Sequence, residues 1–170
     1  MKEAFREEAI GALCSGGAHP EDESPDRGVG EIEFRPVRTE GVQASGETNA
    51  QGERERLDLI RTWMPHEGWP KRDLRITAID VENGSLQIWT ANSYASLHQA
   101  VASSCAVPTL YPPVEIAGRR YIDGGVGSPT NASVAVGFDL VIVIDPRGGV
   151  SPLAGEVEQL EESGSRTLVL

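Results

Sequence analysis

Leu140 to Ile144, which reads L-V-I-V-I, decides the fold of this 170-residue sequence. Five consecutive apolar residues, four of them β-branched, are typical of a strand that is covered on both faces in a mostly parallel sheet. Helix patterns lie on either side at 131–136 and 156–162. Further strand patterns occur at 74–81 and 167–170. This alternation of strands and helices predicts an α/β fold with helices layered on a mostly parallel central sheet.

Two turn signals predict β-hairpins upstream of this run. The first is Asn-Gly at 83–84, and the second is Ala-Gly at 117–118. Each lies between two short strand patterns, at 74–81 and 86–90 and at 114–116 and 120–122. Apolar residues at helical spacing predict two helices, at 53–64 and 96–104. Both hairpins and the second of these helices fall within residues 61–170, which we treat as one region of the chain.

The charge of the chain excludes one class of partner. Fifteen Lys and Arg face twenty-six Asp and Glu, a net charge of −11. Because a nucleic-acid surface needs clustered basic side chains, no nucleic-acid partner is expected. No run of eighteen apolar residues occurs, and the N-terminus lacks a signal-peptide pattern, so we expect a cytoplasmic protein without a transmembrane segment. The cysteines and histidines lack metal-ligand spacing, so neither a metal nor a cofactor is expected.

Residues 1–60 differ in composition from the rest of the chain. They hold 14 of the 26 acidic side chains. The stretches 15–30 and 39–55 contain almost no apolar residue, so they cannot bury enough surface to offset the entropy of ordering. We therefore predict an acidic, partly flexible variable region, with a short helix at 1–13 and a short strand at 31–37.

One motif has the form of a catalytic site. Tyr121-Ile122-Asp123-Gly124-Gly125 places a carboxylate at the end of a predicted strand, followed by two glycines. Open α/β sheets bind their ligands in crevices at strand ends, which favours a functional role for Asp123. The alternative is a turn aspartate whose carboxylate caps neighbouring backbone N–H groups. Residue types alone leave both interpretations open.

Several segments, taken in order, resemble the C-terminal part of a bacterial patatin-like phospholipase domain. They are Trp69-Pro70, L-R-I-T-A-I-D at 74–80, A-V-A-S-S-C-A-V-P at 100–108, Y-P-P-V at 111–114, G-R-R-Y-I-D-G-G-V at 118–126, S-P-T-N-A at 128–132 and G-F-D-L-V-I-V-I at 137–144. The resemblance implies that residues 61–170 form the C-terminal part of an incomplete three-layer patatin-like domain that is truncated at its end. It also implies lipid ester hydrolysis by a serine–aspartate dyad in the full family domain, and it matches Asp123, with Gly124 and Gly125, to the dyad aspartate.

The other half of the implied dyad is not found in this sequence. No serine has glycine at both −2 and +2, as a G-x-S-x-G nucleophile elbow requires. The nucleophile is therefore expected to be absent, and the chain alone is predicted to be inactive. Two hypotheses remain. The chain is a truncated lipid acyl hydrolase, cut short at its C-terminal end as well and acting on a lipid or ester in the full domain. Alternatively, it is a non-catalytic fragment that works as a binding or interaction module.

Other candidate residues have plainer interpretations. Cys105, among alanines and a valine, is expected to be a small buried residue rather than a nucleophile. Arg119 and Arg120 could meet anionic head groups, although hairpin arginines are more often solvated. Two further sets are expected to serve packing or solvation: Ser103 and Ser104, and the histidines His19, His66 and His98.

Overall fold

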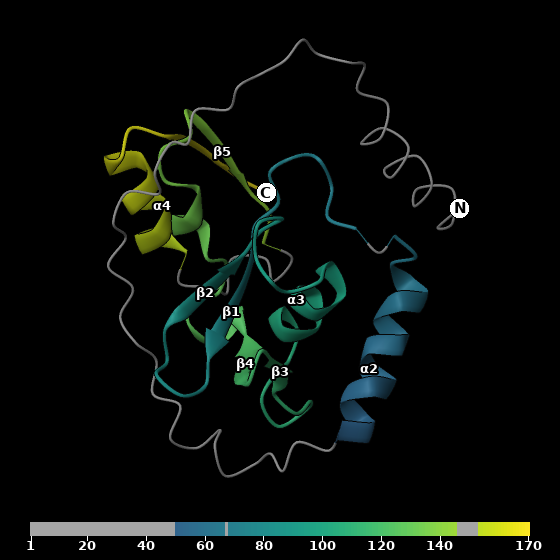
Figure 1. Cartoon of the computed structure of the whole chain (residues 1–170). Coiled ribbons are helices and arrows are strands. Elements are labelled where there is room, and N and C mark those ends of the chain that lie inside the picture. Colours follow the sequence, from purple (N-terminus) through teal and green to yellow (C-terminus); the bar gives the residue numbers. More distant parts are fainter. Residues whose placement is uncertain (1–49, 67, 146–152) are drawn as a thin grey trace, which may run out of the picture.

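The computed structural model describes residues 50–66, 68–145 and 153–170. In chain order, its elements are α2 (Ala50–Trp63), β1 (Ile76–Asp80), β2 (Leu86–Trp89), α3 (Leu97–Ser104), β3 (Val114–Ile116), β4 (Arg119–Asp123), the 3₁₀ turns η1 (Gly124–Val126) and η2 (Ala132–Ala135), β5 (Leu140–Val143), α4 (Ala154–Glu162) and β6 (Arg166–Val169). Figure 1 shows these elements as an α/β arrangement, which confirms the predicted class. The helix predicted at 1–13 and the strand predicted at 31–37 lie outside the described residues.

The larger sheet has four strands in the order β2-β1-β4-β3, and every pairing in it is antiparallel. The two predicted hairpins are confirmed, because Gly84, Ala117 and Gly118 adopt the positive φ values that tight hairpin turns require. Such short turns can only join antiparallel strands. The expectation of a mostly parallel sheet is therefore wrong for this sheet. Parallel pairing occurs between β5 and β6.

Both faces of this sheet carry buried apolar side chains. On one face, α3 packs against the strands, and α2 packs against α3. A capping box starts α3, in which Ser96 and Gln99 exchange side-chain to backbone hydrogen bonds. The other face buries Ile79, Val81 and Ile122. The sheet is thus a covered scaffold that fixes the position of the turn after β4.

The strand predicted at Leu140 to Ile144 is present as β5, but it is covered on one face only. Val141 and Val143 are buried against Leu160 of α4 and Ala132 of η2. Side chains on the other face are exposed, among them Ile142 at 53% and Ile144 at 72%. The expectation that this strand is covered on both faces is therefore wrong for the described residues. Since β5 pairs with β6, and α4 and η2 pack on a single face, nothing described covers the other face.

Candidate functional site

Asp123 is the last residue of β4, and both its backbone N–H and its side-chain carboxylate form hydrogen bonds. Its backbone N–H donates to the Ala106 carbonyl at 3.1 Å, which ties the end of the strand to the segment after α3. Its Oδ1 accepts a hydrogen bond from the Gly125 N–H at 2.6 Å. Asp123 is half-buried and caps the turn η1. The capping interaction and an accessible carboxylate therefore occur together, so the two sequence interpretations do not exclude each other.

The glycines that follow Asp123 are required by close contacts. A Cβ on Gly124 would lie 2.5 Å from Thr77 Oγ1 and 2.8 Å from the Thr77 carbonyl oxygen in β1. A Cβ on Gly125 would lie 2.9 Å from Oδ1 of Asp123. The first glycine thus lets the turn press against β1, and the second leaves the carboxylate unobstructed. The structure brings together all three residues of the predicted motif.

Asp123 lies at the edge of a cavity of about 560 Å³. Nearly half of its lining residues belong to η2 and β5, among them Ala132, Val134, Val141 and Ile142. The lining is mixed, because the carboxylates of Asp123 and Asp145 and the polar side chains of Thr130 and Asn131 lie among the apolar residues. Apolar walls combined with a few polar groups are usual in small-molecule sites. The arrangement can place a carboxylate beside an apolar ligand.

Arg56 of α2 is a positively charged residue that interacts electrostatically with Asp123. Arg56 donates from Nη2 to the Cys105 carbonyl at 2.5 Å, and its guanidinium lies 3.8 Å from the centre of the Tyr111 ring. Burial lowers the pKa of Arg56, while the negative charge of Asp123 is among the influences that oppose this shift. Burial and the charge of Asp123 raise the pKa of the Cys105 thiol, and Arg56 opposes them. A thiol with a raised pKa is a poor nucleophile, as predicted. Although neighbouring groups partly desolvate the thiol, Cys105 as a whole residue is exposed to solvent, so the expectation that it is a buried residue is wrong.

Sequence reasoning missed Asn131 as a part of this site. Its side chain is 6% exposed and lines the cavity that Asp123 borders. Its backbone is left-handed, with φ 52° and ψ 32°, a conformation that asparagine tolerates better than most residues. An Asn in a Ser-Pro-Thr-Asn turn ahead of a helical segment is the signal that could have identified it.

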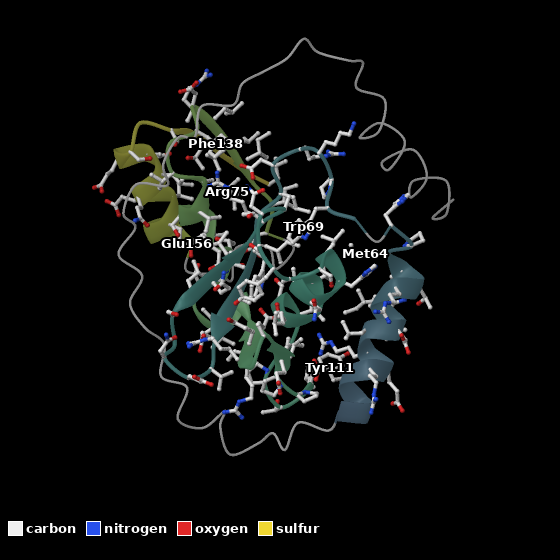
Figure 2. All side chains as sticks on the ribbon, viewed as in Figure 1. Met64, Trp69, Arg75, Tyr111, Phe138 and Glu156 are labelled. Carbon is white, nitrogen blue, oxygen red and sulfur yellow. The ribbon has the colours of Figure 1, made fainter. Side chains whose placement is uncertain are left out.

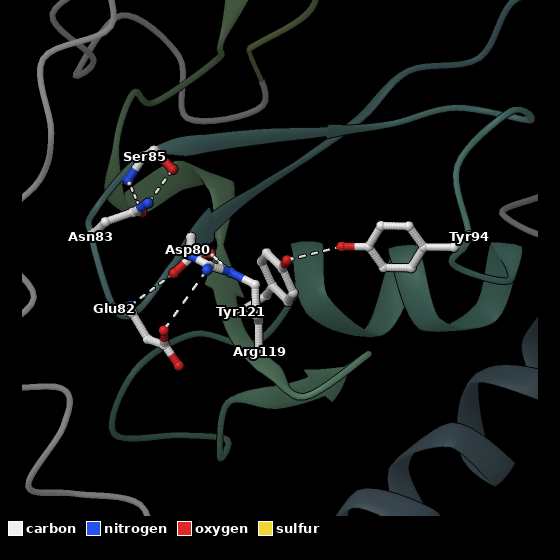
Figure 3. A network of polar contacts seen from close by, with 7 residues as sticks. All are labelled: Asp80, Glu82, Asn83, Ser85, Tyr94, Arg119 and Tyr121. Atoms are coloured by element: carbon white, nitrogen blue, oxygen red, sulfur yellow. Dashed lines mark hydrogen bonds and ion pairs between the residues drawn. The ribbon is translucent and has the colours of Figure 1, made fainter.

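The arginine pair at the start of β4 lies at the opposite end of that strand from Asp123. Arg119 donates from Nε to Asp80 Oδ2 at 2.6 Å, and its Nη1 lies 3.9 Å from Glu82 Oε2 (Figure 3). The hydrogen bond to Asp80 raises the pKa of Arg119. Arg119 is therefore engaged by carboxylates of its own chain, which is neither the head-group contact nor the free solvation considered from sequence.

The remaining candidate residues that the structure describes do not line the cavity at Asp123. His98 is buried, with Nε2 2.8 Å from the Met64 carbonyl oxygen, and Ser103 is buried between Trp89 and Ala100, so both serve packing. His66 is exposed, and His19 lies outside the described residues. Within the described ranges, no three His, Cys, Asp or Glu side chains lie close enough to hold a metal ion.

A comparison with known protein families shows to which family this chain belongs. A sequence model of the patatin-like phospholipase family matches residues 28–136, which is more than half of the chain. The chain belongs to the patatin-like phospholipase family. No curated protein matches the sequence.

The patatin-like match contains the Asp123 site and both hairpins. It begins ahead of Trp69, where the motif resemblance starts, and it ends before the segment 137–144. The β5 wall of the cavity therefore lies beyond the matched residues. Within the described part of the chain, no helix is both long and apolar enough to cross a bilayer.

Proposed function

We propose that this chain carries the general-base half of a lipid acyl hydrolase, with Asp123 as the base. In this role, Asp123 accepts the proton of a serine hydroxyl as the hydroxyl oxygen attacks the carbonyl carbon of an ester. The serine would come from a G-x-S-x-G elbow, a pattern that these 170 residues do not contain. The proposal therefore assigns Asp123 its role in a domain that also includes the elbow.

One observation carries this proposal: the Asp123 carboxylate is fixed at a strand end and lines a cavity that also has apolar side chains from η2 and β5 in its walls. Gly125 donates to Oδ1, so a backbone N–H orients the carboxylate. The cavity of about 560 Å³ has room for an apolar group beside it. Membership of the patatin-like phospholipase family supports an ester of a lipid as the substrate class.

The test uses the 170-residue chain by itself and the same chain fused behind a segment with a family elbow and glycine-rich loop. With p-nitrophenyl butyrate, the chain alone should show no turnover above a heat-denatured blank, because it lacks the nucleophile. The fusion should hydrolyse the ester, and Asp123→Asn should lower its rate by about 10²-fold or more, since an amide cannot accept the serine proton.

Two controls complete this test. Asp139→Asn removes an exposed carboxylate outside the cavity lining and should leave the rate unchanged. The proposal is wrong if the Asp123→Asn fusion keeps more than about a tenth of the parent rate, set against the 10²-fold or larger effect of a general base. It is also wrong if a cooperatively folded fusion is no faster than the blank. Robust hydrolysis by the chain alone, lost in Asp123→Ala and in one serine variant, would contradict the assignment of the nucleophile to an elbow.

A further inference from the structure

Asn131 makes three hydrogen bonds to the chain segment that follows Asp123. Its Nδ2 donates to the Gly124 carbonyl at 3.1 Å and to the Ser128 carbonyl at 2.9 Å. Its backbone N–H donates to Ser128 Oγ at 2.9 Å. The Gly124 carbonyl also accepts from the backbone N–H of Gly127 at 3.0 Å. One buried side chain thus holds a carbonyl group of the Asp-Gly-Gly motif and a carbonyl group of the loop that follows it.

The Gly124 carbonyl belongs to the same peptide group as the Gly125 N–H, which donates to Asp123 Oδ1. Because a peptide group is planar, fixing the direction of its C=O bond also fixes the direction of its N–H bond. On the other side, Gly124 presses against Thr77 of β1, so closely that a Cβ there would overlap Thr77. The peptide group is therefore held between the sheet and Asn131.

The orientation of the Asn131 amide is determined by its partners. Two carbonyl oxygens lie near one end of the amide, so that end must be the NH₂ group, since the opposite orientation would place Oδ1 against both of them. In the present orientation, Oδ1 is buried and has no hydrogen-bond partner among the described residues. Leaving a buried acceptor unbonded is unfavourable. The Asn131 amide is thus oriented so that both N–H groups of Nδ2 are hydrogen-bonded, although Oδ1 is left without a partner among the described residues.

We propose that Asn131 is a positioning residue for Asp123 that acts through the Gly124–Gly125 peptide group. This inference rests on the proposed role of Asp123 as the base. Asn131 holds the carbonyl of that peptide, the peptide directs its N–H at the Asp123 carboxylate, and the carboxylate is thereby aimed at the cavity. Aspartate or leucine would fill a similar volume without supplying the two N–H donors.

The experiment measures hydrogen exchange of the Gly125 amide in the full chain, by mass spectrometry with fragmentation that resolves single residues. Asn131→Gly removes the clamp and tolerates φ 52°, so it separates the hydrogen bonds from backbone strain. We expect Gly125 to exchange at least about tenfold faster in this variant, as loss of about 1.4 kcal/mol would give. The amides of Ile79 and Tyr121, inside β1 and β4, should keep their parent rates.

Asn83→Ala is the matched control. Asn83 also bonds its own turn through Oδ1, at 3.0 Å from the Ser85 N–H, but it lies in the β1–β2 hairpin. Its replacement should leave the exchange of Gly125 unchanged. An unchanged Gly125 rate in Asn131→Gly would overturn the inference, and so would a uniform acceleration that includes Ile79 and Tyr121.

Two further measurements complete the test. If Asn131→Gly does not fold, hydrogen exchange of the parent chain in low concentrations of denaturant tests the inference instead. The Nδ2–H groups of Asn131 and the N–H of Gly125 should then become exchangeable at the same denaturant concentration. A Gly125 N–H that stays protected after the Asn131 side chain exchanges would contradict the inference. In the elbow fusion, Asn131→Gly should lower kcat about tenfold or more with KM nearly unchanged, because a positioning residue acts in the transition state. A fusion in which Asp123→Asn is inactive but Asn131→Gly keeps the parent kcat would refute this inference and leave the role of Asp123 standing.

Discussion

The four-stranded sheet and the β5–β6 pair both contain strands with large apolar side chains, yet these side chains are covered to different extents. In the first, Ile79 and Ile122 are almost fully buried, at 1% and 0% exposed. In the second, Ile142 and Leu168 lie opposite one another in the register and are about half exposed. Apolar sequence therefore predicts that a strand forms, whereas the elements packed on it decide which faces are buried. The candidate site lies where the two regions meet, since Asp123 comes from the first and the β5 wall from the second.

Side-chain contacts connect the four-stranded sheet to the region of β5, β6, η2 and α4. Arg75, just ahead of β1, donates to the Val134 carbonyl of η2 at 3.3 Å, and its guanidinium lies 5.8 Å from the Phe138 ring centre. Just ahead of η2 in the chain, Thr130 donates a hydrogen bond to Glu156 of α4. Figure 2 labels Arg75, Phe138 and Glu156 in this part of the molecule. The loop that carries Asn131 is thus tied to both regions.

The largest expected contrast is between two isoleucines. Ile122→Ala should lower the free energy of unfolding by about 2–5 kcal/mol, because it leaves a cavity in a covered core. Ile142→Ala, on the exposed face of β5, should change it by about 0.5 kcal/mol or less. Urea unfolding of both variants, at protein concentrations low enough for the chain to be monomeric, checks the contrast. Equal losses would mean that the exposed face of β5 is buried in solution.

A second contrast compares two glycines. Gly124→Ala should destabilise the chain by about 1–3 kcal/mol, since the new Cβ would overlap Thr77. Gly155→Ala, in α4, should be neutral or stabilise by up to about 1 kcal/mol, because nothing lies within 4 Å of its Cβ position and alanine favours helix. Thermal unfolding of the pair measures both. A harmless Gly124→Ala would show that the turn does not press against β1.

A third prediction concerns the exposed apolar face formed by Leu140, Ile142, Ile144, Leu168 and Leu170. Contiguous exposed apolar side chains favour dye binding and self-association, so the chain should bind the hydrophobic dye ANS and elute from a sizing column larger than a monomer. Ile142→Lys should weaken both effects, whereas Leu59→Lys, at an exposed position of α2, should not. Weak dye binding by a monodisperse parent chain would contradict the open face.

The smallest expected effect is a pH dependence at α2. Burial raises the pKa of Glu53 above 4.5, against the hydrogen bond that its Oε1 accepts from the Glu115 N–H. A carboxyl group with a raised folded pKa favours the folded state below about pH 4.5 and loses that contribution as the pH rises through the folded value. Glu53→Gln should therefore raise the melting temperature slightly at pH 7 and leave it unchanged at pH 4. A lower melting temperature at pH 7 would reverse the sign of the effect.

Local patterns in the sequence predict most of the elements but not their covering or the orientation of their pairing. The Asn83-Gly84 turn, the helix of small residues and the strand at Leu140 to Ile144 depend on neighbours in the chain, and the structure contains them. Strand direction and coverage depend on which distant segments pack together, so the sheet was expected to be mostly parallel and β5 to be covered twice. Cys105 was wrongly expected to be buried for the same reason.

The candidate site shows the same division. Asp123 and its glycines are predictable because strand, carboxylate and turn are adjacent in sequence. The Ser-Pro-Thr-Asn pattern signals a turn at Asn131, but its contact with Gly124, seven positions earlier, depends on the path of the intervening loop and does not follow from that pattern. Arg56 lies on α2, and its approach to the Cys105 carbonyl depends on the packing of α2 against α3.

The central claim, that Asp123 is the base, is tested most directly by the rate at which a fluorophosphonate probe labels the serine of the elbow fusion. The probe reports activation of the hydroxyl and needs no lipid. We expect labelling in the parent fusion and a reduction of about 10²-fold or more in Asp123→Asn, with Asp139→Asn at the parent rate. Equal labelling of the parent and the Asp123→Asn fusion would contradict the assignment of Asp123 as the base.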